Sequence, residues 1–137
     1  MIEWIHFLSS FWMMTVIWFV QIVHYPLFAY VPKYSRIEYS RKHQQWISVL
    51  VMPGMLIEAI SLVLLGKEML FNQQWILMLL SLLIIWGSTF FLQVPCHNNL
   101  LKDPNDRIVR KLVSTNWIRT FFWTLKTIIV GNYVIGS

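Results

Sequence analysis

Polar side chains that can do chemistry interrupt the long apolar runs of this sequence at only a few positions. These positions are Gln21, His24, Glu58, Gln93, His97, Asn116, Arg119 and Lys126. An imidazole near a carboxylate can act as a general base, and a guanidinium can stabilise a developing oxyanion. Imidazole also ligates copper, iron, zinc and haem iron. The residue types therefore indicate either proton transfer on an organic substrate or ligation of a metal or haem.

The composition indicates that these residues belong to a membrane protein. Of the 137 residues, 57% are hydrophobic, 16% are aromatic and only 12% are charged, whereas soluble domains carry about 25% charged residues. A soluble domain of this length has too little interior to bury so much apolar surface. The composition excludes a soluble globular enzyme, a disordered tail and a nucleic-acid-binding module. The single cysteine, Cys96, excludes a disulfide framework and a zinc site made only of cysteines.

The predicted fold class is all-α: a four-helix transmembrane bundle that forms one domain over residues 1–137. The expected spans are about 4–31, 43–66, 74–98 and 111–134. Each is longer than the roughly 20 residues that cross about 30 Å of hydrocarbon. The second span is interrupted by Glu58, and the fourth by Arg119 and Lys126. Ionisable groups inside spans are costly and usually face the interior of the bundle, so we expect these side chains to point inward.

Two basic segments predict how the bundle is oriented. Residues 32–42 and 99–111 carry most of the lysine and arginine side chains, whereas no basic side chain precedes the first span. The positive-inside rule places both basic segments, expected to be loops, in the cytoplasm and both termini on the extracytoplasmic side of the plasma (inner) membrane.

The spacing of the polar residues predicts that they converge. Residues three or four positions apart share a helix face, so Gln21 faces the same way as His24 and Tyr25. The same spacing joins Gln93 to His97, and Asn116 to Arg119 and Trp123. A rise of about 1.5 Å per residue places these groups in the cytoplasmic half of the membrane. His43 is expected at the inner edge, Glu58 near the midplane, and Lys126 high enough to reach the outer surface.

The two halves of the chain contain similar short segments. Gln21 and His24 in the first span match Gln93 and His97 in the third, and Gln45-Trp46 matches Asn116-Trp117. Either two helical hairpins are duplicated about an axis along the membrane normal, or the matches are chance similarities in an apolar, Trp-rich sequence. A true duplication would place the repeated polar residues at the centre of the bundle.

Several structural and functional alternatives stay open. Glu58 and Arg119 could form a buried ion pair that only fixes helix packing. His24 and His97 could be interfacial histidines that bond to headgroups or carbonyls. The chain could also be a small transporter or a structural module. Transport would favour a homo-oligomer, because one protomer of four short spans leaves little room for a path.

Four segments together resemble one family over nearly the whole chain. They are Gln21-x-x-His24-Tyr25-Pro26, Glu58 in the second span, Pro95-x-His97-Asn98-x-Leu100 and Asn116-Trp117-x-Arg119-Thr120. The combination resembles the anthrone oxygenase-like family of small four-span membrane proteins. The resemblance implies a membrane-embedded monooxygenase that needs no cofactor. It marks Asn98, Asn116 and Arg119 as motif residues, with His97 beside Asn98.

We therefore predict a membrane-embedded oxidoreductase that takes a hydrophobic small molecule from the lipid bilayer. The predicted catalytic residues are His24, His97, Glu58 and Arg119, and the predicted substrate-binding residues are Gln21, Tyr25, Gln93, Asn98, Asn116 and Trp123. His24 or His97 would take a proton from the substrate. Arg119, with Asn98 and Asn116, would hold the resulting oxyanion, and Glu58 would set the charge of Arg119 or orient a histidine.

The alternative function is non-enzymatic binding of haem or a transition metal. Its predicted ligands are His24, His43 and His97, because imidazole suits both groups. No His-x-x-x-His pair lies on one helix, so the spacing alone does not identify the metal.

Overall fold

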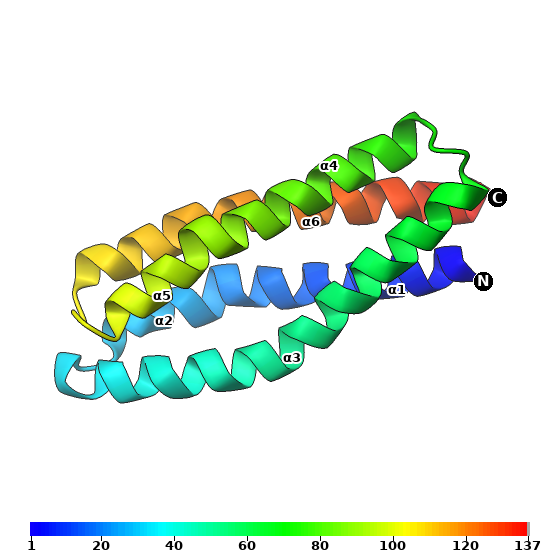
Figure 1. Ribbon diagram of the computed structural model, residues 1–137. Coiled ribbons are helices and arrows are strands. Elements are labelled where there is room, and N and C mark those ends of the chain that lie inside the picture. Colours follow the sequence, from blue (N-terminus) through cyan, green and yellow to red (C-terminus); the bar gives the residue numbers. More distant parts are fainter. Residues whose placement is uncertain (137) are drawn as a thin grey trace.

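The computed structural model describes residues 1–136, and every regular element in that range is helical. The elements form antiparallel rods connected by short segments (Figure 1). The first rod contains α1 (Ile2–Phe19), a π-helical segment (Val20–His24), α2 (Tyr25–Leu27) and a 3-10 turn (Phe28–Tyr30). The others are α3 (Lys33–Glu68), then α4 (Gln73–Ser88) with a π segment (Thr89–Gln93) and α5 (Val94–Leu100), and finally α6 (Asp106–Gly136). The prediction of an all-α fold is confirmed.

Three rods are long and apolar enough to cross a membrane: Ile2–Tyr30, Lys33–Glu68 and Gln73–Leu100. The helix α6 is as long as the others but carries Arg119 and Lys126 within its apolar stretch. Both termini lie at one end of the bundle beside the α3–α4 connection, and the two basic connections lie at the opposite end (Figure 1).

Helix α3 begins well before the predicted span. Residues 33–42, expected to be a loop, form its first turns, so that expectation is wrong. The reason is an amphipathic pattern: Arg36, Ser40 and His43 are buried on one face, while Arg41 and Lys42 stay exposed. Hydropathy therefore predicted the apolar stretch but not the start of the helix.

Arg36 joins the connection that precedes α3 to the connection that precedes α6. Its guanidinium is 2% exposed and donates to the backbone carbonyls of Ala29, Val31 and Pro104. Its Nη1 lies 2.6 Å from Oδ1 of Asp106, at the start of α6. The hydrogen bond from Arg36 lowers the pKa of the Asp106 carboxyl, which favours its charged form.

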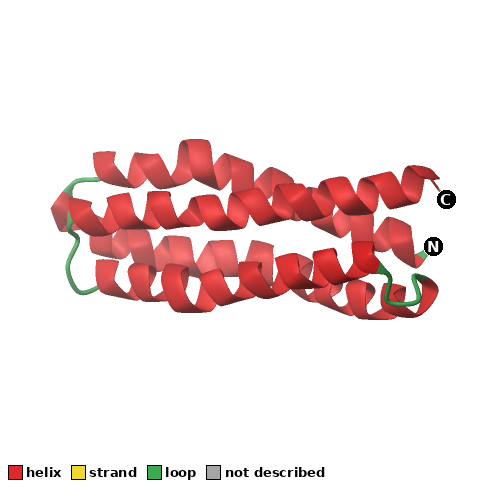
Figure 2. Cartoon of the chain, turned by 90° about the horizontal axis from the view of Figure 1, so that it is seen from above, coloured by secondary structure: helices red, strands yellow, loops and turns green. Residues whose placement is uncertain are grey.

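The helices do not pack evenly. The helix α1 lies along both α3 and α6, and α4 lies along α6, whereas α3 meets α4 and α5 over a smaller area. The axes stay roughly parallel when the bundle is seen from above (Figure 2). Pro53 lies in the middle of α3, where a proline bends a helix. At Gly54 a Cβ atom would lie 2.7 Å from Sδ of Met13, so this glycine allows α1 and α3 to approach closely.

The two π segments occupy corresponding places in the first and third rods. Each is followed, two residues after its end, by a proline: Pro26 after His24 and Pro95 after Gln93. The wider turn relieves the clash that a proline makes with the preceding carbonyls. The packing is less symmetric. If the two halves of the chain were repeats, α1 would correspond to α4 and α3 to α6, so the contact of α1 with α6 would correspond to that of α4 with α3. The first contact is extensive and the second is small.

Candidate active site

Three histidines from three rods meet near the end of the bundle that carries the basic connections. Nε2 of His24 lies 2.7 Å from Nδ1 of His43, and Nε2 of His97 lies 3.0 Å from Oη of Tyr25. The ring centroid of His43 is 5.1 Å from that of His97 and 4.5 Å from that of His24. His43 therefore lies between the other two histidines.

The π segments help to place these side chains. His24 is the last residue of the first π segment, and Gln93 is the last residue of the second. A π turn holds an extra residue, which rotates the following residues relative to a continuous α-helix. Tyr25 and His97 follow the two segments and are brought to one hydrogen bond in the interior.

A second group of polar side chains joins the first rod to α6. Nδ2 of Asn116 donates to Oε1 of Gln21 over 2.8 Å, and Nε2 of Gln21 donates to the carbonyl of Val113. Thr120 donates to the same Oε1. Gln93 donates through Nε2 to Oγ1 of Thr115 on α6. Both glutamines thus fasten their helices to α6.

Arg119 extends this group toward the histidines. Its side chain is 7% exposed, its Nη1 donates to Oδ1 of Asn116 over 3.3 Å, and its Cζ lies 5.2 Å from the centroid of the Trp123 ring. Its Nε has no hydrogen-bonding partner, and none of the ion pairs formed within residues 1–136 includes it. A buried guanidinium without a carboxylate is costly, and it favours binding of an anion.

The loose packing between α3 and the third rod leaves a cavity of about 170 Å³ beside Arg119. Polar side chains from all four rods line it: Tyr25, Gln44, Ser48, Thr89, Gln93, His97 and Arg119. Apolar side chains of α3 such as Val51 and Met55 form much of the remaining wall. The cavity therefore combines a cation, an imidazole and a phenol inside an apolar enclosure, which is the pattern of a small-molecule site.

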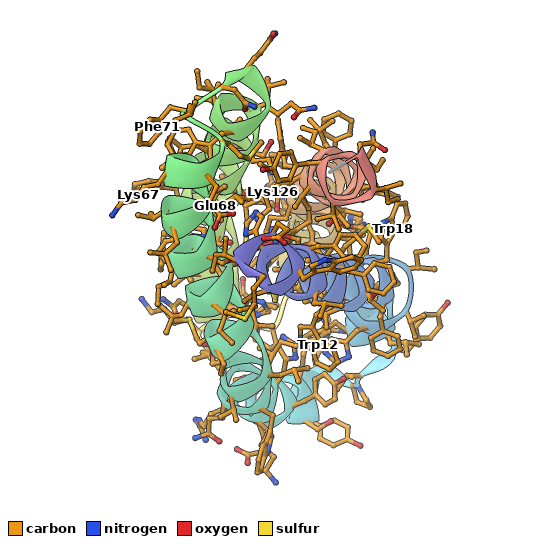
Figure 3. All side chains as sticks on the ribbon, turned by 90° about the vertical axis from the view of Figure 1, so that its right-hand side faces the viewer. Trp12, Trp18, Lys67, Glu68, Phe71 and Lys126 are labelled. Atoms are coloured by element: carbon orange, nitrogen blue, oxygen red, sulfur yellow. The ribbon has the colours of Figure 1, made fainter. Side chains whose placement is uncertain are left out.

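Glu58 does not belong to this cavity. Its carboxylate forms an ion pair with Lys126 and accepts a hydrogen bond from Nε1 of Trp123 over 3.0 Å. The expected pairing of Glu58 with Arg119 is wrong, and so is the expectation that Lys126 reaches the outer surface, because its side chain is 0% exposed (Figure 3). Lys126 lies two turns beyond Arg119 on the same face of α6, which brings it to the height of Glu58.

Sequence reasoning missed His6. Its ring is 0% exposed, its Nδ1 lies 2.9 Å from Oγ of Ser61, and Ser61 donates to the carbonyl of Glu58. With Lys126 these residues form a second polar cluster in the half of the bundle that holds the termini. In the sequence, His6 belongs to a series at helical spacing with Ser10, Met13 and Ile17. All four residues are buried in the structure, so this spacing was the signal that could have identified His6.

Two other expectations change. Asn98 is exposed and lines no cavity beside Arg119 or the histidines. No group of three or more histidine, cysteine, aspartate or glutamate residues could hold a metal ion in the part of the chain that the structure describes. His24 and His97 instead bond to His43 and Tyr25, so the expected metal ligands do not converge on one point.

Comparisons of the chain with models of known protein families, with curated protein sequences and with solved structures find no match.

Proposed function

We propose that the chain is an integral membrane oxidoreductase of the anthrone oxygenase-like type, which acts on a hydrophobic, enolisable small molecule in the cavity between α3 and α5. The observation that carries the proposal is the uncompensated Arg119 guanidinium, which shares that cavity with the imidazole of His97. Arg119 and Asn116 also belong to the motifs that resemble this family.

His97 is the proposed base. Its Nε2 is bonded to Tyr25 and its Nδ1 has no partner. When Nε2 carries the hydrogen and donates to Tyr25, Nδ1 keeps a free lone pair that can accept a proton. His24 does not line the cavity, so it is a weaker choice of base than sequence reasoning suggested.

The proposed reaction removes a proton from a methylene group conjugated with a carbonyl. His97 accepts that proton, and the negative charge moves to the carbonyl oxygen, where Arg119 stabilises it. The electron-rich carbanion then reacts with O₂. One oxygen atom becomes the new carbonyl of the product, the other leaves as water with both methylene hydrogens, and no further reductant is needed.

The bilayer supplies the substrate in this proposal. A cavity of about 170 Å³ is smaller than the roughly 300–1,000 Å³ of ordinary ligand pockets. It would enclose the reacting end of the molecule, while the rest lies between α3 and α4 among lipid chains.

We further propose that α6 is the fourth span, over about 111–134. Its charged side chains Arg119 and Lys126 are buried in the bundle, so they place no charge against lipid. With basic residues gathered at one end, the positive-inside rule puts that end in the cytoplasm and the termini outside.

Oxygen uptake tests the proposal. The full chain in phospholipid nanodiscs should consume oxygen when anthrone is added, above the rate of empty nanodiscs. Arg119→Gln should lower kcat by about 10²–10³, the size of losing one oxyanion-stabilising group. The matched control is Gln73→Asn, an exposed change at the start of α4, which should leave kcat unchanged. An Arg119→Gln protein as active as the parent would refute the assignment.

A further inference from the structure

A second and larger space lies on the adjacent face of α3. It is a groove of about 710 Å³ between α1 and α3, with walls formed mostly by apolar side chains. Trp12, which is labelled in Figure 3, lines it together with Phe19, Trp46 and Leu50, and Trp12 lies close to Gly54 of α3. Its polar end is formed by the His24–His43 pair. The proposed reaction uses neither this groove nor that pair.

The charges around the groove favour a neutral occupant. Lys42 is the charged residue of its lining, and its ammonium already lies 3.7 Å from the carboxylate of Glu38. Arg41 lies 2.9 Å from the same carboxylate, and the Lys42 side chain is 67% exposed. A phosphate headgroup would therefore find one water-exposed ammonium at the rim of the groove and no buried cation. A neutral head group with a long apolar tail matches the lining better than an anionic lipid does.

The histidine pair offers one hydrogen-bond donor and one acceptor in either of its tautomers. A neutral imidazole has one N–H and one lone pair, and the short contact joins Nε2 of His24 to Nδ1 of His43. If His24 donates in that contact, its Nδ1 is an acceptor. If His43 donates, Nδ1 of His24 carries the hydrogen. Movement of hydrogens within the pair thus converts Nδ1 of His24 from an acceptor to a donor.

Nδ1 of His24 is available to a ligand. His24 is half-buried, and within residues 1–136 its Nδ1 makes no hydrogen bond. The ring lies nearly parallel to the rings of Phe19 and Tyr39, with interplanar angles of 23° and 29°. Both of these rings also line the groove, so a flat aromatic or quinonoid ring has surfaces on which to stack.

We propose that this groove binds a quinone with a long apolar tail, in both its oxidised and its reduced form. The quinone carbonyl accepts a hydrogen bond when Nδ1 of His24 is protonated, and the quinol hydroxyl donates one when it is not. The tail lies along Trp12, Trp46 and Leu50. Few lipophilic head groups change from acceptor to donor in this way, which is why the switchable pair points to a quinone.

Fluorescence of the groove tryptophans tests the proposal. The full chain in phosphatidylcholine nanodiscs is titrated with a benzoquinone that carries a decyl tail. Saturable quenching of tryptophan fluorescence is expected, and His24→Phe, which keeps a ring but removes both nitrogens, should weaken binding about tenfold. The quinol, measured by competition, should bind the parent within about threefold of the quinone.

Further variants separate the groove from the rest of the protein. Leu50→Trp fills the groove without touching the histidines and should abolish saturable quenching, which keeps the test decisive if His24→Phe fails to fold. Trp117→Phe removes an exposed tryptophan of α6 outside the groove lining and should leave the affinity unchanged.

Two results would overturn the proposal. One is equal quinone affinity in the parent, His24→Phe and Leu50→Trp. The other is tryptophan quenching that rises linearly with the quinone concentration in the parent and never saturates, because it would show that the quinone only partitions into the bilayer. The proposal does not rest on the proposed oxygenase reaction: Arg119→Gln should slow oxygen uptake by about 10²–10³ while leaving quinone affinity unchanged.

Discussion

The buried ion pair of Glu58 and Lys126 offers a quantitative test of the structure. Both side chains are 0% exposed, and the carboxylate has one further partner, Nε1 of Trp123. We consider three variants: Lys126→Met, Glu58→Gln, and both changes together. Glutamine keeps an oxygen that can accept the hydrogen bond from Trp123.

The expected costs differ because each single change leaves one charge without its partner. Breaking a buried ion pair by removing one member costs about 3–5 kcal/mol. The double variant removes both charges and leaves one buried amide N–H₂ group to satisfy, which costs about 1–3 kcal/mol. We therefore expect the double variant to be more stable than either single variant.

Equilibrium unfolding in mixed micelles, followed by circular dichroism, measures these free energies. Lys67→Met is the matched control, since Lys67 is exposed and projects away from the bundle (Figure 3). It should change the stability by less than about 0.5 kcal/mol. If the effects of Lys126→Met and Glu58→Gln simply add in the double variant, the two groups are not coupled and the reasoning is wrong.

Two further predictions concern the ends of the bundle. Asp106→Asn should destabilise the protein at pH 7, and the difference from the parent should shrink once the pH falls below about 4 and vanish below the lowered pKa of the folded state. The hydrogen bond from Arg36 lowers the pKa of Asp106 in the folded state. The contribution of Asp106 to stability is therefore complete above the pKa of the unfolded state and is lost as the pH falls through the pKa of the folded state. Unfolding measured from pH 7 to 3 checks this. Gly66→Ala should destabilise by about 1–3 kcal/mol despite the better helix propensity of alanine. Its Cβ would lie 2.9 Å from Nε1 of Trp75, which is held by a hydrogen bond to Leu62; a stability equal to or above the parent's in the same unfolding experiment would contradict this.

Much of the fold could be predicted from periodicity and hydropathy. Apolar runs of more than 20 residues require long helices, and the helical spacing of Gln21, His24 and Tyr25 correctly placed them on an inward face. The same spacing on α6 correctly placed Asn116, Arg119 and Trp123 inside. These results depend only on local geometry, which the sequence specifies directly.

The pairing of charges could not be predicted from the sequence in the same way. Glu58 had two cations available on α6, Arg119 and Lys126, which are two helix turns apart, and it pairs with Lys126. The choice depends on how high α3 stands against α6. Both helices pack along α1, where Met13 meets Gly54 of α3. The pairing left Arg119 without a carboxylate beside the cavity, which is the observation on which the proposed function depends.

The sequence by itself determined that the chain forms apolar helices with polar side chains on their inner faces, because composition and spacing act within single helices. Only the tertiary structure decided which of those side chains meet. It joined His24 to His43, buried His6 beside Ser61, exposed Asn98, and opened both the cavity and the groove along α3. The physical reason is that contacts between helices depend on their relative height, rotation and separation, and no local pattern fixes these quantities.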